Sequence, residues 1–168
     1  MLSAVEFNLF ISPSFKTEEQ KRQGRSFPLN HDLHKLVLQN LGFELTEGQL
    51  KAIKEIEQDQ FADIQMMRML QGDVGSGKTL IALLTMLNVV NSGTQTALMA
   101  PTDLLSAQHY QFFCSALENT TIKIKVVSCF SSRNNFAREK NIYHCLMRKQ
   151  TCSDFKTLSL KFNIDNYS

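Results

Sequence analysis

The stretch Leu70–Val90, LQGDVGSGKTLIALLTMLNVV, decides the fold class of this chain. It begins with a glycine loop that fits the pattern G-x-x-x-x-G-K-T and continues as a nearly uninterrupted apolar run. The loop comprises Gly72, Asp73, Val74, Gly75, Ser76, Gly77, Lys78 and Thr79. A strand before such a loop and a helix after it form a phosphate-binding unit. We therefore predict a strand–loop–helix phosphate site in an α/β chain.

Each fixed residue of the loop has a physical role. The glycines let successive backbone N–H groups point inward at phosphate oxygens, and the helix that starts there adds the positive end of its dipole. Lys78 brings a full positive charge to the outer phosphates, and the Thr79 hydroxyl is suited to ligate Mg²⁺. The alternative is a glycine-rich turn with an incidental lysine, but the apolar segments on both sides favour the phosphate site.

Apolar runs and capping residues outline the rest of the fold. Helices are expected from Asn30 to Gly42, from Thr46 onward and from Thr102 onward, and the loop helix should run from Lys78 to about Ser92. Gln49 completes a capping box with Thr46, and Leu45 and Leu50 are placed as a hydrophobic staple. Buried strands are expected in MMRMLQ (66–71), TQTALMA (94–100) and TIKIKVVSCF (121–130). Alternating strands and helices predict a mostly parallel sheet flanked by helices.

Three segments carry a family resemblance: FELTEGQLKAIKEIEQD (43–59), MMRMLQGDVGSGKT (66–79) and TALMAPTDLLSAQHY (96–110). Together they resemble the first motifs of the RecG-type ATP-dependent DNA helicases. The resemblance covers about Ser26 to Val127 and implies the front part of a RecA-like motor domain. It also implies binding of ATP and Mg²⁺, a catalytic role for Lys78, and a family function in remodelling forked or branched DNA during recombination and repair.

The resemblance assigns further residues. Phe43 and Gln49 match the motif that recognises adenine, although closing the capping box is an equally good use of the Gln49 amide. Pro101 and Thr102 match the motif whose strand-to-helix turn touches the DNA backbone, and Thr102 is at least as well explained as a plain N-cap.

Beyond the third predicted strand the family pattern stops. The family continues with an Asp-Glu pair that holds Mg²⁺ and activates water, and with a second motor domain that supplies an arginine finger. Acidic residues after Thr79 are never adjacent in this sequence, and Asp165 is the nearest imitation. We therefore expect a truncated, nucleotide-binding fragment that is inactive alone. The alternatives are a degenerate, non-enzymatic lobe that binds DNA or a partner protein, and a small self-sufficient NTPase, which the missing pair disfavours.

Three regions are expected along the chain: a linker or helical arm over 1–29, the front of the motor domain over 30–127, and a divergent tail over 128–168. No glycine follows Gly93, and the family pattern fades near Val127. We therefore expect a shift of reading frame there and a tail without selected function. Within the tail, REKNIYHCLMRK (138–149) is expected to form an ordinary surface helix.

Composition sets the remaining limits. The net charge of +2 does not indicate a nucleic-acid binder by itself. The four cysteines lack zinc spacing, so free thiols are expected. The sequence shows no signal-peptide pattern and no apolar stretch of about 20 residues, which predicts a cytoplasmic chain without membrane contact. His31 and His34 are three residues apart, but a solvated helix face is favoured over a metal site because no further ligands lie nearby in sequence, and no metal cluster is expected.

Overall fold

The helix that follows the glycine loop, α3 (Lys78–Asn91), runs through the centre of the core. The computed structural model describes residues 10–12, 23–29, 31–66, 68–128, 143–149 and 161–163. Every residue of α3 from Leu80 to Val90 is buried. A helix that is apolar around its whole circumference must be enclosed by other elements, which explains why this segment occupies the centre.

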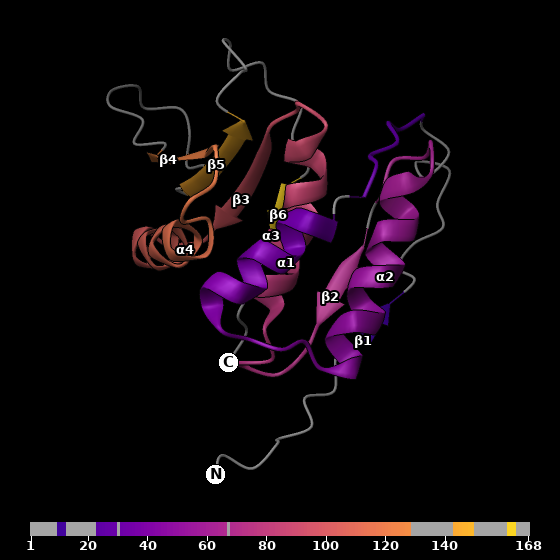
Figure 1. Ribbon diagram of the computed structural model, residues 1–168, viewed down its shortest axis with the longest axis horizontal. Helices are drawn as coiled ribbons and strands as arrows, with labels where there is room; N and C mark the ends of the chain where they lie inside the picture. Colours follow the sequence, from indigo (N-terminus) through magenta and orange to yellow (C-terminus); the bar gives the residue numbers. More distant parts are fainter. Residues whose placement is uncertain are drawn as a thin grey trace, which may run out of the picture.

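Three helices surround α3. They are α1 (His31–Leu41), α2 (Glu47–Phe61) and α4 (Asp103–Ala116). In Figure 1, α1 crosses in front of α3, with α4 on one side and α2 on the other. All four helices start where expected, and α1 and α3 also end where expected, with Gly42 and Gly93 following them at φ of +64° and +78°. None of the helices in these described ranges is long and apolar enough to cross a membrane.

The strands form two separate sheets. Strand β1 (Phe10–Ser12) pairs antiparallel with β2 (Met69–Gln71). The larger sheet has the order β4-β5-β3-β6 and consists of β3 (Thr96–Ala100), β4 (Ile122–Ser128), β5 (Tyr143–Lys149) and β6 (Lys161–Asn163). Strand β3 is almost wholly buried, as expected.

The expected mostly parallel sheet is not confirmed for the described strands. Among the described strands, only β3 and β6 pair in parallel, whereas β3–β5, β4–β5 and β1–β2 are antiparallel. Strand β5 lies between β3 and β4 and pairs antiparallel with both. The observed α/β composition agrees with the expected class, while most of the described strand pairs are antiparallel.

Two local expectations were also wrong. Residues 143–149 form a strand rather than a surface helix, because pairing on both sides overrides weak local preference. Strand β2 exists but is not buried. Leu50 is 52% exposed, so the apolar stripe of α2 consists of Ala52, Ile53 and Ile56.

Candidate nucleotide-binding site

The glycine loop bends through left-handed backbone conformations at two positions. Gly75 has φ +82° and Gly77 has φ +84°, a region that side chains with a Cβ rarely adopt. The space around the two glycines differs. A Cβ on Gly75 would meet nothing within 4 Å, but one on Gly77 would lie 2.4 Å from Gln49 Nε2. The backbone conformation therefore favours glycine at Gly77, and an added Cβ would also displace the end of the Gln49 side chain.

Lys78 closes back over the loop. Its Nζ donates hydrogen bonds to the carbonyl oxygens of Gly72 at 2.7 Å and Asp73 at 2.8 Å. The ammonium is half-buried and is held by neutral carbonyls rather than by a carboxylate. A phosphate that reached this ammonium would therefore compete with uncharged acceptors, and charge-assisted hydrogen bonds are the stronger kind.

The N-terminus of α3 is open. Gly77 is its N-cap residue, and none of the side chains in the described ranges caps it. The first N–H groups of a helix have no intrahelical acceptor, so they need another partner. Beside them, Ser76 Oγ is buried and has no hydrogen-bond partner among the described residues. An anion with several acceptor oxygens supplies what both groups lack.

Gln49 links α2 to the loop. Its Oε1 accepts from the Thr46 N–H at 3.0 Å, and the Thr46 hydroxyl accepts from the Gln49 N–H at 3.3 Å, so the predicted capping box is confirmed. Its Nε2 donates to the Ser76 carbonyl at 2.9 Å. The sequence offers capping and adenine recognition as alternative roles of the Gln49 amide, and it does not predict the contact with the loop. Both amide atoms are occupied in this structure.

Three further residues assigned from the sequence are wholly or partly exposed. Phe43 lies between α1 and α2 with 56% of its surface exposed. Thr79 stands in the first turn of α3 and is half-buried. Val74, at the tip of the loop, is 75% exposed.

Thr102 is used as an N-cap. Its hydroxyl accepts from the Leu105 N–H at 3.2 Å at the start of α4. Pro101 and Thr102 are both exposed, on the turn between β3 and α4. The N-cap interpretation is confirmed, and contact with a DNA backbone stays a prediction for this turn.

A polar cluster behind the loop helix was missed. His34 is buried, so the expected solvated face is wrong for this residue. Its Nε2 lies 2.8 Å from the Leu84 carbonyl oxygen of α3, and its Nδ1 lies 3.7 Å from Glu57 Oε1 of α2. Burial lowers the pKa of His34, while the nearby Glu57 carboxylate acts in the opposite direction. Glu57 stands on another helix, so spacing along the chain could not reveal this contact.

The loop residues fit a bound phosphate group. The fit rests on the uncapped start of α3, the orphaned Ser76 hydroxyl and the Lys78 ammonium held by neutral carbonyls. All three features are donors, and they converge on one short loop. Among the loop residues, only Asp73 carries a negative charge, and its side chain is exposed.

The chain is similar in sequence to several ATP-dependent DNA helicases RecG. The chain is 41% identical over 113 residues to the "ATP-dependent DNA helicase RecG" of Aquifex aeolicus (strain VF5), a match of 67% of this chain and 14% of the relative. RecG of Borreliella burgdorferi is 47% identical over 100 residues, with 60% and 15% covered. RecG of Escherichia coli (strain K12) is 45% identical over 94 residues, with 56% and 14% covered.

These relatives confirm the resemblance to the RecG type. The chain spans about a seventh of the length of the curated relatives it matches. The family description "DEAD/DEAH box helicase" matches residues 46–158, which include the capping box, the glycine loop, the turn after β3 and strand β5. The match covers well over half of the chain, and the chain therefore belongs to the DEAD/DEAH box helicase family.

Proposed function

We propose that this chain is the ATP-binding portion of a RecG-type helicase motor and that it binds ATP·Mg²⁺ through the Gly72–Thr79 loop. The observation that carries the proposal is the start of α3, where no side chain of the described residues caps the helix. Lys78 and the orphaned Ser76 hydroxyl lie at the same place. An uncapped helix start, an unpartnered hydroxyl and an ammonium held only by neutral carbonyls together suit a phosphate group.

The individual roles follow from chemistry and position. The N–H groups of the loop and of the first turn of α3 hold the phosphates, and Lys78 neutralises their charge. Thr79 is the proposed Mg²⁺ ligand, and the metal would supply further charge neutralisation when bound. Exposed Phe43 is the proposed contact for the adenine ring. A contact between Gln49 and adenine requires the Gln49 amide to release Ser76 or Thr46 first.

Within a complete motor, we propose that this part serves ATP-driven remodelling of forked or branched DNA, with the exposed turn at Pro101 and Thr102 touching one strand. The 168-residue chain alone should bind nucleotide without efficient hydrolysis. Its sequence has no adjacent acidic pair after Thr79, and phosphoryl transfer depends on several positioned charges.

Titration calorimetry with ATP·Mg²⁺ tests the binding site. We expect Lys78→Ala to weaken binding about 10- to 100-fold, because hydrogen bonds to a charged group are worth about 1.5–3 kcal/mol each. The matched control is Thr102→Ala, which removes a helix cap outside the loop and should leave affinity unchanged. Equal affinities of Lys78→Ala and the parent chain would contradict the proposal.

A DNA assay separates the two functional classes. A branched-DNA unwinding assay should give no ATP-dependent product with this chain alone. Binding of branched DNA that is equal with and without ATP, and equal in Lys78→Ala, would favour the non-enzymatic lobe over an ATP-responsive fragment.

A further inference from the structure

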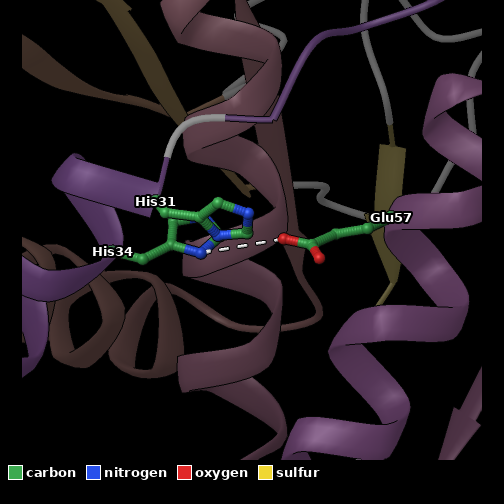
Figure 2. A group of neighbouring side chains, drawn as sticks. All are labelled: His31, His34 and Glu57. Atoms are coloured by element: carbon green, nitrogen blue, oxygen red, sulfur yellow. Dashed lines mark ion pairs between the residues drawn. The ribbon is translucent and has the colours of Figure 1, made fainter.

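The two histidines of α1 and one glutamate of α2 bring three metal-ligating atoms together. His31 and His34 lie one helical turn apart, and Glu57 faces them from α2. One ligand atom from each of the three residues lies within 4.8 Å of the others. Figure 2 shows the two imidazoles and the carboxylate pointing toward one another across the path of α3. Hereafter these three residues are called the His31–His34–Glu57 cluster.

The hydrogen bonds of His34 orient it as a ligand. The Leu84 carbonyl oxygen can only accept, so Nε2 is the nitrogen that donates to it, at 2.8 Å. In the neutral ring, the lone pair then belongs to Nδ1, which is the nitrogen that faces Glu57 Oε1 at 3.7 Å. Metal-ligating histidines almost always donate their other ring N–H to a carbonyl or carboxylate in this way. The Leu84 carbonyl therefore favours the His34 tautomer that a metal needs, and the Asn88 side chain also hydrogen-bonds to this ring.

The cluster is placed for a cation. Two imidazoles and one carboxylate are a ligand set found around zinc, with a fourth position left to water. Ligand atoms about 2.0–2.1 Å from a tetrahedral zinc are roughly 3.3 Å from one another. His34 and Glu57 are already close to that separation, and both are buried. His31 is exposed at the first residue of α1, so its ring is free to turn inward.

We propose that His31, His34 and Glu57 form a binding site for one divalent transition-metal ion, with zinc the preferred ion. A bound ion would tie α1 to α2, and through the hydrogen bond from His34 it would also hold both to the middle of α3. The site lies in the helices behind the glycine loop and uses none of the loop residues. The proposal is therefore independent of nucleotide binding.

Titration of the full chelator-treated chain with Zn²⁺ tests the site, with Co²⁺ as a spectroscopic probe. We expect one ion per chain and a visible Co²⁺ spectrum of four- or five-coordination. His31→Ala should weaken Zn²⁺ binding at least tenfold, because even loss of a supporting group costs a metal site about 10- to 100-fold. His31 is exposed, so this change should leave the fold intact. Mg²⁺ should not compete, since it prefers oxygen ligands.

Matched variants separate this site from incidental binding. Glu57→Gln keeps the shape of the buried side chain and removes its charge, so it should also weaken binding. His109→Gln, which changes a histidine on α4, and Cys114→Ser, which removes an exposed thiol, should not. Zn²⁺ should raise the unfolding midpoint of the parent chain by several degrees and that of His31→Ala much less. Equal Zn²⁺ affinity in the parent chain and His31→Ala, or loss of binding in either control, would overturn the proposal.

Discussion

Helices α3 and α4 each begin just after a strand, and their first residues are built in opposite ways. At the start of α4, the Thr102 hydroxyl accepts a hydrogen bond from the Leu105 N–H. At the start of α3, Gly77 adopts φ +84° and offers no side chain. The buried faces also differ, since α3 is enclosed from Leu80 to Val90, whereas α4 buries only Ser106, Phe113 and Ala116.

The deeper burial of α3 explains how its first N–H groups can lack a capping side chain while the helix stays folded. A missing cap costs about 1 kcal/mol, and apolar burial of a single large side chain contributes about 1.5–3 kcal/mol. The core holds α3 in place regardless of its first turn. Helix α4 buries fewer residues, so its stability depends more on its N-cap. The buried core therefore tolerates a helix start without a capping side chain at α3.

The largest expected effect comes from adding a side chain at Gly77, the N-cap residue of α3. Gly77→Ala should lower the free energy of unfolding by about 2–3 kcal/mol, measured by urea denaturation. About 1–2 kcal/mol of this is the left-handed backbone, and about 1 kcal/mol is the displaced hydrogen bond from Gln49 to Ser76.

Gly93→Ala is the matched control for Gly77→Ala. Gly93 has φ +78°, and nothing lies within 4 Å of an added Cβ, so only the backbone cost applies. Equal losses of stability in the two variants would mean that the Gln49 contact contributes nothing.

Removing the N-cap side chain of α4 should have a smaller effect. Thr102→Ala should lower the free energy of unfolding by about 1 kcal/mol, the usual cost of losing an N-cap. Thr46→Ala should cost a similar amount at the start of α2. A loss well above 2 kcal/mol for Thr102→Ala would show that α4 depends on more than its cap. A decrease in ATP affinity would show that the two helix starts are not independent.

A conservative change of Gln49 separates its two contacts. Gln49→Glu keeps an oxygen for the Thr46 N–H and replaces the amide nitrogen that donates to the Ser76 carbonyl. We expect a loss of about 0.5–1.5 kcal/mol of stability and an altered ATP affinity. Circular dichroism melts and titration calorimetry measure the two. A change of stability as large as that of Thr46→Ala, with ATP affinity unaltered, would assign Gln49 to capping alone.

The smallest expected effect concerns pH and belongs to α4. Burial lowers the pKa of His109 below its usual 6.5. Between the folded pKa and 6.5 the unfolded chain binds more protons, so the free energy of unfolding falls as pH drops below 6.5 and is level above it. His109→Gln should remove part of this slope in denaturation curves taken from pH 7.5 to 5.5. An unchanged slope would rule out His109 as a contributor.

Local chemistry was predictable from the sequence, and long-range pairing was not. The capping box at Thr46, the cap at Thr102 and the limits of α3 depend on residues a few positions apart. The partner of β3 is β5, more than forty residues away, and no short-range pattern encodes that choice. Glu57 likewise meets His34 only after α1 and α2 have packed on α3.

The same limit applies within the candidate site. The glycine loop was found because its residues are contiguous and each has a fixed role. The hydrogen bond from Gln49 to Ser76 was not predicted because it joins α2 to the glycine loop, two parts of the chain that are distant in sequence. The division of the chain at residues 29 and 127, and the reading-frame shift near Val127, stay predictions. The family match nevertheless continues to residue 158, and residues 143–149 lie inside the larger sheet.

The position of β5 has a consequence for synthesis on the ribosome. Strands β3 and β4 both pair with β5, which also contacts α3. About forty residues lie between β3 and β5. At a synthesis rate of roughly 5–20 residues per second, β5 is made some seconds after β3. During that interval, β3 and β4 present unpaired edges that another nascent chain could join. The loop helix is thus made before the strand that joins β3 to β4, and translation speed across residues 101–149 should influence how much chain escapes aggregation.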